Sequence, residues 1–328
     1  MMTYIYGPVS SWRYGRSLGL DVTAPPKKCT FNCVYCQIGP TKRHVDSPEG
    51  LQNTMPSPID IIIELGQTLE KLDKETIDVL TFSGTGEPTL NMNIGETLTS
   101  ARERVGDLPI ILLTNASLLP RRDVRKRISS FDIVTAKYDA GDEDTFRRIN
   151  RPARSGFTLH EIQDGIIQLQ REMKGMLALE VMLLRGPRGL SNTEGASRKA
   201  LLEGIAEVNP DLVQIYTPWR PSAVKSVKPV SSRILHEFGS ELEEYFGKER
   251  LWIYGTHDAR GQGVKWKSHH NIEEEIMDLL RRRPCRIADI TKSLDLKSST
   301  TTCIIGKLQV AGRVRVKRMQ TDVFYESG

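Results

Sequence analysis

Three cysteines within eight residues are the part of the sequence best suited to chemistry. Cys29, Cys33 and Cys36 have the spacing C-x3-C-x2-C, and such short intervals let one loop bring all three thiols to a single metal centre. Thiolates are the soft ligands that iron–sulfur clusters take. Three protein ligands for a four-iron cluster leave one iron open to a small molecule. The spacing therefore predicts a [4Fe-4S] cluster with one coordination position available.

A zinc site, or a set of structural thiols, is the alternative explanation for these cysteines. Structural zinc ions take four ligands, and no fourth cysteine lies nearby; the closest candidate is His44. Cys285 and Cys303 lie far downstream, where we expect them to be ordinary small core residues. Five cysteines in 328 residues do not form a disulfide-stabilised scaffold.

The composition limits the class of protein. Apolar residues make up 38% of the chain and charged residues 27%, as in ordinary globular proteins. No apolar run approaches the roughly 18 residues of a membrane span, and the N-terminal segment lacks the features of a secretion signal. We therefore expect a cytoplasmic protein without a membrane partner. The net charge of +5 permits a polyanionic partner but does not demand one.

Strand and helix patterns alternate along most of the chain. Six strands are predicted from their apolar patterns, at residues 17–23, 77–83, 109–113, 131–137, 177–184 and 211–216. Helices are predicted at residues 58–72, 93–105, 120–130, 142–149, 158–173, 194–208 and 231–246. This alternation implies βαβ units around a parallel sheet. Six strands are too few for a complete eight-fold barrel, so we predict an α/β fold, a partial (β/α)6 TIM-like barrel.

Conspicuous polar and aromatic residues follow these strands. In chain order they are the cysteine loop (residues 29–36), the glycine loop (residues 84–88, Gly-Thr-Gly-Glu-Pro), Thr114 and Asn115, Asp139, and Trp219 with Arg220. In barrels of this type the active site lies at the C-terminal ends of the strands. Their consistent placement therefore predicts a single active site that includes the cysteine loop.

The pattern changes from residue 271 onward. Three short helices and a hairpin, with strands at 313–318 and 323–325, resemble a winged-helix module. We therefore predict a barrel over residues 1–253, a linker over 254–270 and a winged-helix-like domain over 271–328. The third helix carries one cation, Lys307, whereas a helix that reads the major groove presents several polar and basic groups. We expect this domain to bind a peptide or an RNA backbone, or to dimerise.

Tyr35 stands directly before the last of the three cysteines, an arrangement that resembles the signature of radical S-adenosylmethionine (SAM) enzymes. The resemblance extends over most of the chain, through Gly7-Pro8 and residues 16–19, 83–88 and 139–152. Together these segments are similar to wyosine-synthetase-related Fe–S oxidoreductases, many of which carry a C-terminal winged helix. Unlike true wyosine synthases, this chain shows neither a second N-terminal cysteine cluster nor a flavodoxin domain.

The glycine loop has both a local and a functional explanation. Glycines without a Cβ let a ligand approach the backbone, and Glu87 or its neighbouring backbone can accept hydrogen bonds from an ammonium group. The resemblance implies that Gly84, Gly86 and Glu87 hold the amino group of SAM. A tight turn before a helix is the alternative.

The resemblance also implies roles for residues at the other strand ends. Tyr35 and its backbone would lie near the adenine of SAM. Asn115, Lys137 and Asp139 are candidates for contacts with the ribose and the carboxylate. Each of these three side chains could instead cap a turn or a helix.

Several arginines allow two explanations. Arg13 and Arg16 either solvate the surface or contact a carboxylate of the substrate or cofactor. The arginines between residues 147 and 154 are typical of a solvated face, although at the barrel mouth they would suit a phosphate or carboxylate. Trp219 and Arg220 either stack on a planar substrate or anchor the end of the barrel.

The predicted activity is that of a radical SAM enzyme, an Fe–S oxidoreductase with a [4Fe-4S] cluster on Cys29, Cys33 and Cys36. Such an enzyme cleaves SAM reductively and abstracts hydrogen from a substrate, which here is unknown. The C-terminal domain favours a macromolecular substrate, a tRNA or a protein, and the chemistry implies a low-potential electron donor of the flavodoxin or ferredoxin type.

Two other functions remain open. The first is an iron–sulfur redox sensor that regulates transcription by binding nucleic acid through the winged helix. Such a sensor would need neither the glycine loop nor a SAM pocket. The second is an electron-transfer protein, which would tolerate the loss of Glu87.

Overall fold

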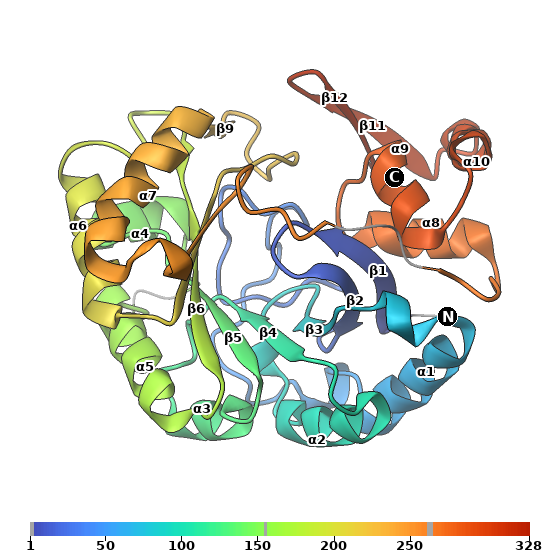
Figure 1. Cartoon of the computed structure of the whole chain (residues 1–328), viewed down its shortest axis with the longest axis horizontal. Coiled ribbons are helices and arrows are strands. Elements are labelled where there is room, and N and C mark those ends of the chain that lie inside the picture. The colour runs from blue at the N-terminus through green and yellow to red at the C-terminus, as the bar shows by residue number, and fades with distance from the viewer. Residues whose placement is uncertain (1–2, 154–155, 261–264) are drawn as a thin grey trace.

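The computed structural model describes residues 3–153, 156–260 and 265–328. Its centre is a curled eight-stranded sheet in the order β1-β2-β3-β4-β5-β6-β8-β10, with helices along its outer face (Figure 1). The strands are β1 Ile5–Ser11, β2 Gly15–Asp21, β3 Val79–Ser83, β4 Ile110–Thr114, β5 Ile133–Lys137, β6 Met176–Met182, β8 Leu212–Tyr216 and β10 Leu251–Ile253. The partial barrel predicted from the sequence is therefore confirmed.

The helices of the barrel follow the predicted order. They are α1 Pro58–Lys71, α2 Ile94–Val105, α3 Arg122–Ile128, α4 Glu143–Ile149, α5 Leu159–Glu172, α6 Gly195–Val208 and α7 Ser232–Phe246. Shorter elements are the 3-10 turns η1 Gln52–Thr54, η2 Lys74–Thr76, η3 Pro88–Leu90 and η4 Lys248–Arg250, and the two-residue strands β7 Leu184–Arg185 and β9 Lys228–Pro229.

Two strands of the main sheet differ from the sequence prediction. The six predicted strands are present and pair in parallel, but β1 joins β2 antiparallel at one edge and β10 joins β8 in parallel at the other. In β1, Gly7 and Pro8 interrupt the strand pattern, and the pairing shifts register between Tyr6 and Val9. Proline is tolerated there because the strand lies at a sheet edge. The three residues of β10 are too few to show a period.

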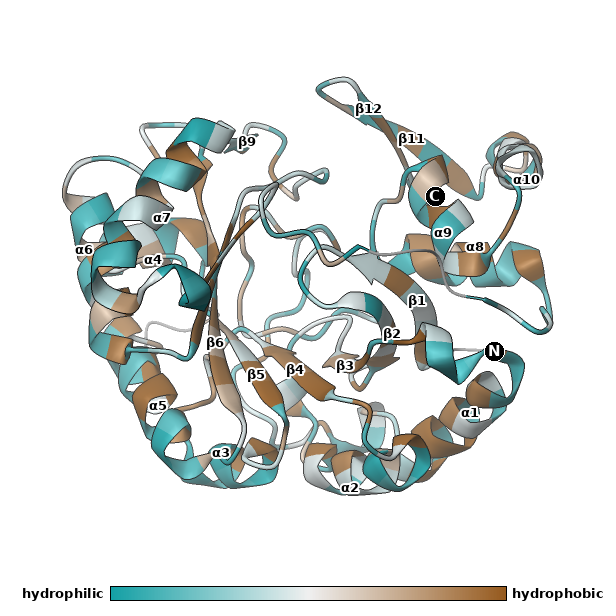
Figure 2. Cartoon of the chain, viewed as in Figure 1, coloured by the Kyte–Doolittle hydropathy of each residue, from teal (hydrophilic) through white to brown (hydrophobic). Residues whose placement is uncertain are grey.

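The amphipathic pattern of α1 shows how the outer helices bury the sheet. Ser57 caps the N-terminus, and Pro58 occupies the first turn, where its missing N–H is not needed. Ile61, Leu65 and Leu69 recur every four residues and are buried in the main core. Figure 2 shows the same arrangement around the sheet, with apolar strands inside and polar faces of the helices outside.

The C-terminal module, residues 271–328, consists of three helices and a two-stranded hairpin. Its elements are α8 Ile272–Arg282, α9 Ile287–Leu294, α10 Ser298–Val310, β11 Val314–Met319 and β12 Asp322–Ser327. Its own core includes Ile276, Leu280, Ile290 and Ile305, and Val9 of β1 belongs to that same core. Figure 1 shows the module beside β1. Its classification as a winged helix and the three domain limits stay predictions.

Two smaller expectations have different outcomes. Cys285 is buried as expected, but Cys303 is exposed, because Thr301, Ile305 and Leu308 form the buried face of α10 and Cys303 lies off that face.

The predicted linker is attached to both the barrel and the C-terminal module where the structure describes it. Trp266 Nε1 donates to the Ser293 carbonyl at 3.0 Å; residues 261–264 lie outside the described residues. Within the described ranges, no helix is long and apolar enough to cross a membrane.

Candidate active site

The cysteine loop is fixed to the barrel by the residues between its cysteines. Phe31 is buried and packs edge-on against Phe146 of α4, with ring centroids 5.5 Å apart. The backbone N–H of Val34 donates to the Ile149 carbonyl at 2.9 Å, and Cys36 N–H closes a turn on the Cys33 carbonyl at 3.2 Å. The apolar residues therefore anchor the loop, while Cys33 and Cys36 stay half-buried.

Each thiol of the loop has a nitrogen donor beside it. Asn115 Nδ2 lies 3.6 Å from the sulfur of Cys29, and Asn150 Nδ2 lies 3.7 Å from that of Cys33. Lys27 Nζ lies 3.1 Å from the sulfur of Cys36. Burial raises the pKa of Cys29, and it raises that of Cys33 to about 12. Thiols in such surroundings ionise when a metal centre balances their charge.

The surroundings of the three sulfurs can be compared with the requirements of a single metal ion and of a cluster. In the part of the chain that the structure describes, no three His, Cys, Asp or Glu side chains are gathered to hold one ion. A zinc site requires its ligands to converge on one point, whereas an iron–sulfur cluster takes each thiolate on a different iron. The donors beside the three sulfurs fit a [4Fe-4S] cluster, because hydrogen bonds to sulfur stabilise its negative charge.

The glycine loop lies directly against the start of the cysteine loop. Lys28 N–H donates to the Thr85 carbonyl at 3.1 Å, and Glu87 N–H donates to the Lys28 carbonyl at 2.8 Å. A Cβ on Gly86 would lie 1.6 Å from the Lys28 carbonyl oxygen, and Gly86 has a φ of +146°. From the sequence alone, this freedom is explained by the approach of a ligand. In the structure, Gly86 is required first for the approach of the two loops.

Glu87 is buried and its carboxylate is occupied by neighbouring donors. One oxygen accepts from Thr89 N–H at 3.1 Å, and from the hydroxyls of Thr89 and Thr114 at 2.6 Å each. The other accepts from Asn115 N–H at 2.7 Å. Burial raises the pKa of Glu87, and these hydrogen bonds oppose that increase. Glu87 therefore joins the ends of β3 and β4 and positions Asn115.

Asp139 holds Tyr35 in place instead of facing the cavity. Its side chain accepts hydrogen bonds from the Tyr35 hydroxyl, from Asn150 Nδ2 at 2.9 Å and from Met182 N–H at 2.9 Å. Lys137 Nζ lies 3.1 Å from Oδ1 of this carboxylate, the oxygen that also accepts from Met182 N–H, and 4.8 Å from the centre of the Tyr35 ring. Asp139 thus connects the cysteine loop to the end of β5.

A buried ion-pair network forms the floor of the site. Arg13 Nη1 lies 2.8 Å from the Glu180 carboxylate, and Lys137 Nζ hydrogen-bonds the Tyr216 hydroxyl at 2.9 Å. Burial alone would raise the pKa of Glu180, but Arg13 and Lys137 outweigh it and hold the pKa at about 2. Arg13 therefore pairs with a protein carboxylate, as does Arg16, which lies 2.6 Å from Asp78.

These side chains surround a cavity of about 350 Å³ at the C-terminal strand ends. Eight of the ten predicted site residues line it: Cys33, Tyr35, Cys36, Gly84, Gly86, Glu87, Asn115 and Lys137. Cys29 and Asp139 lie behind this surface. Glu180 and Tyr216 also line the cavity, although the sequence patterns did not predict them as site residues. A glutamate in the apolar strand β6 was the available signal, because a buried charge needs a partner.

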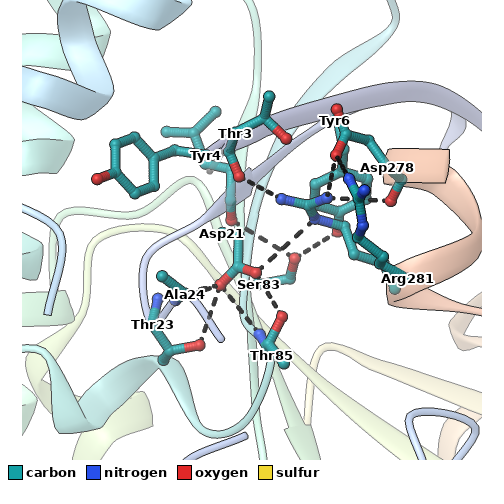
Figure 3. Close-up of polar contacts among 12 residues, drawn as sticks. Thr3, Tyr4, Tyr6, Asp21, Thr23, Ala24, Ser83, Thr85, Asp278 and Arg281 are labelled. Carbon is teal, nitrogen blue, oxygen red and sulfur yellow. Dashed lines mark hydrogen bonds and ion pairs between the residues drawn. The ribbon is translucent and has the colours of Figure 1, made fainter. Parts of the chain in front are cut away.

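The C-terminal module supplies one wall of the same cavity. Arg282 Nη2 of α8 donates to the Thr3 carbonyl at 2.5 Å, its Nε lies 3.7 Å from Asp21, and its guanidinium lies 4.6 Å from the Tyr6 ring centre. Asp21 also accepts from Thr85 N–H of the glycine loop at 3.0 Å. Figure 3 shows Asp21 between Thr23 and Thr85, with α8 approaching from the other side.

Comparison with known proteins identifies the family. The model of the radical SAM superfamily matches residues 24–186, from the cysteine loop to β7. A UPF0026 protein of Methanocaldococcus jannaschii is 34% identical over 325 residues, which are 99% of this chain and 96% of the relative. The chain belongs to the radical SAM superfamily. Radical SAM enzymes bind a [4Fe-4S] cluster and SAM, and the donors around the cysteine loop fit that requirement.

Other comparisons agree with this radical SAM assignment. A UPF0026 protein of Synechocystis is 37% identical over 221 residues, covering 67% of this chain and 77% of the relative. A radical SAM methyltransferase from Sphaerobacter thermophilus shares the fold, with a TM-score of 0.50 and 13% identity over 70% of this chain and 64% of the methyltransferase. The wyosine-related subgroup finds no support in these relatives, and neither does the regulator alternative.

The remaining arginines of this radical SAM enzyme fall into two groups. Arg147 and Arg148 lie on α4 and form ion pairs with Glu143 and Asp144 one turn earlier, as on a solvated helix face; residue 154 lies outside the described residues. Arg220, in contrast, is buried beside Trp219 and lines the cavity.

Proposed function

We propose that Cys29, Cys33 and Cys36 hold the [4Fe-4S] cluster of this radical SAM enzyme and that its substrate enters the adjoining cavity. The observation that carries the proposal is the convergence of three donor-supported thiols with the glycine loop at one end of the sheet. When bound, the reduced cluster supplies the electron that cleaves SAM, which enables hydrogen abstraction from the substrate.

The protein residues would bind and orient SAM beside the cluster. The backbone of Gly84 and Gly86 lines the cavity and would accept the ammonium group, since the Glu87 carboxylate already has four donors. Asn115, held by Glu87, and Lys137 are placed for the ribose and the carboxylate. Tyr35, fixed by Asp139, would line the adenine position.

The substrate proposed here is a macromolecule, a tRNA or a protein. Support comes from the C-terminal module, because Arg282 and Arg283 of that module line the cavity together with the glycine loop. The same module is the part proposed to bind a partner or a second copy of the chain, and Val310, whose side chain is 93% exposed, is its most prominent apolar residue.

A low-potential electron donor of the flavodoxin or ferredoxin type would pass its electron to the cluster at the cysteine loop. Gln37 is exposed there, directly after the half-buried Cys36. An exposed residue next to a proposed cluster ligand supports electron entry at this loop.

Anaerobic reconstitution with iron and sulfide tests the proposal. We expect about four iron atoms per chain in the parent and, on addition of dithionite and SAM, release of 5′-deoxyadenosine. Cys36→Ala should lose both properties. Cys303→Ala is the matched control, because the same change removes an exposed thiol far from the loop. The proposal fails if the reconstituted parent yields no 5′-deoxyadenosine, or if Cys36→Ala behaves like Cys303→Ala.

A further inference from the structure

Arg220, in the loop after β8, is a buried cation with few partners. Its side chain is 5% exposed, and its Nε has no hydrogen-bond partner among the described residues. The nearest carboxylate belongs to Asp289 of α9, at 4.0 Å, the outer limit of an ion pair. The Trp219 ring lies 3.9 Å from the guanidinium carbon and covers one face. A buried charge in these surroundings is poorly compensated.

The charged residues around Arg220 do not balance its positive charge. Asp289 is held mainly by Arg286, which approaches it at 3.2 Å through the side chain and at 3.0 Å through the backbone N–H. Arg283, at the end of α8, has a buried Nε without a hydrogen-bond partner, and no carboxylate of the described residues pairs with it. Burial and the charge of Arg283 lower the pKa of Arg220 to about 9.

Two cavities meet at this point. Arg220 and Arg283 line the cavity beside the cysteine loop, and Arg283 also lines a second cavity of about 1090 Å³ between the barrel rim and the β11–β12 hairpin. Among the described residues, Glu326 is the one acidic residue in the lining of the second cavity, and it pairs with Lys317. The basic residues there are Lys225, Lys228, Arg281, Arg283, Arg315, Lys317 and Arg318.

We propose that Arg220 and Arg283 form an oxyanion site that binds a phosphate group of the substrate. The inference rests on the proposed function, because the site lies in the wall of the proposed substrate cavity. Guanidinium groups bind phosphate through paired hydrogen bonds, and the phosphate supplies the negative charge that both arginines lack. The basic second cavity attracts the anion from solvent. Figure 1 shows β9 and the β11–β12 hairpin at the top of the molecule, and residues of both line the second cavity.

A purely structural role for Arg220 predicts a different result. In that case the residue clamps the module to the barrel through Trp219 and Asp289, and phosphate has no specific effect. Arg283 provides the second variant, because among the described residues no hydrogen bond, ion pair or cation–π contact joins its side chain to Trp219, and its substitution therefore removes no interaction of the clamp. A phosphate site requires both arginines, whereas a clamp requires only Arg220.

The experiment uses the full-length, cluster-reconstituted protein and isothermal titration calorimetry with inorganic phosphate at constant ionic strength. We expect saturable binding to the parent that weakens at least tenfold in Arg220→Gln and in Arg283→Gln. Arg233→Gln is the control, since it removes the same charge from an exposed position on α7. The proposal is overturned if the parent shows no saturable binding up to about 10 mM, or if either site variant binds as the parent does.

Further ligands identify the source of the phosphate. A nucleoside 5′-monophosphate that binds as tightly as a short RNA oligonucleotide indicates a small phosphate-bearing substrate. Tighter binding of the RNA, again dependent on both arginines, indicates a nucleic acid. Equal competition by oligoglutamate would refute phosphate selectivity. SAM cleavage by the parent is assayed separately: its absence refutes the proposed function, whereas the calorimetry alone decides the phosphate site.

Discussion

Replacing Glu87 by glutamine tests whether this residue positions the active site. The carboxylate accepts four hydrogen bonds, three on one oxygen from Thr89 and Thr114 and one on the other from Asn115 N–H. A glutamine can keep its carbonyl oxygen toward the threonines. Its amide nitrogen then faces Asn115 N–H, so that two donors meet and one buried N–H loses its acceptor.

The size of the effect follows from these contacts. A hydrogen bond to a charged group contributes about 1.5–3 kcal/mol, and an unsatisfied buried donor costs about 1–3 kcal/mol. These two values describe the same lost contact, so they are not added. Burial raises the pKa of Glu87, which means that removing the charge returns part of the loss. We expect Glu87→Gln to lower the free energy of unfolding by about 2 kcal/mol.

Urea-induced unfolding at pH 7, followed by circular dichroism on the reduced, cluster-free chain, measures this change. Glu103→Gln is the matched control, because Glu103 is exposed on α2 and should change stability by no more than about 0.5 kcal/mol. A second measurement is iron retention after reconstitution, which should fall in Glu87→Gln because Asn115 no longer supports Cys29. If Glu87→Gln matches Glu103→Gln in both measurements, the positioning role is wrong.

Two further predictions concern the network and the loop contact. The pKa of Glu180 is depressed to about 2, so its carboxylate contributes fully to stability above its ordinary pKa of about 4.5. This contribution is lost as the pH falls toward 2. When the free energy of unfolding is measured over this pH range, the parent should lose about 3 kcal/mol that Glu180→Gln does not lose. Gly86→Ala should destabilise by more than about 2 kcal/mol and lose the cluster, because its Cβ would overlap the Lys28 carbonyl. Gly106→Ala, also at positive φ but with open space, should bear only the backbone cost of about 1–2 kcal/mol in the same urea assay and should keep the cluster.

Sequence patterns were sufficient where the signal is local. The cysteine spacing and the strand–helix alternation depend on neighbouring residues, so the loop and six strands could be placed. The pairing of Arg13 with Glu180 could not, because it joins positions far apart in the chain and depends on how the sheet curls. Asp139 shows a related limit: its place after a strand was predicted correctly, but its partners Tyr35 and Asn150 come from other segments.

The position of Val9 has a consequence for how the chain folds. Its strand, β1, is synthesised long before the C-terminal module, yet Val9 is buried by residues of that module. A nascent barrel therefore keeps an unfinished edge, open to pairing with other chains, until α8 and α9 arrive. Successful folding in the cell thus depends on shielding that edge during translation, and removal of the module would leave the shielding incomplete permanently.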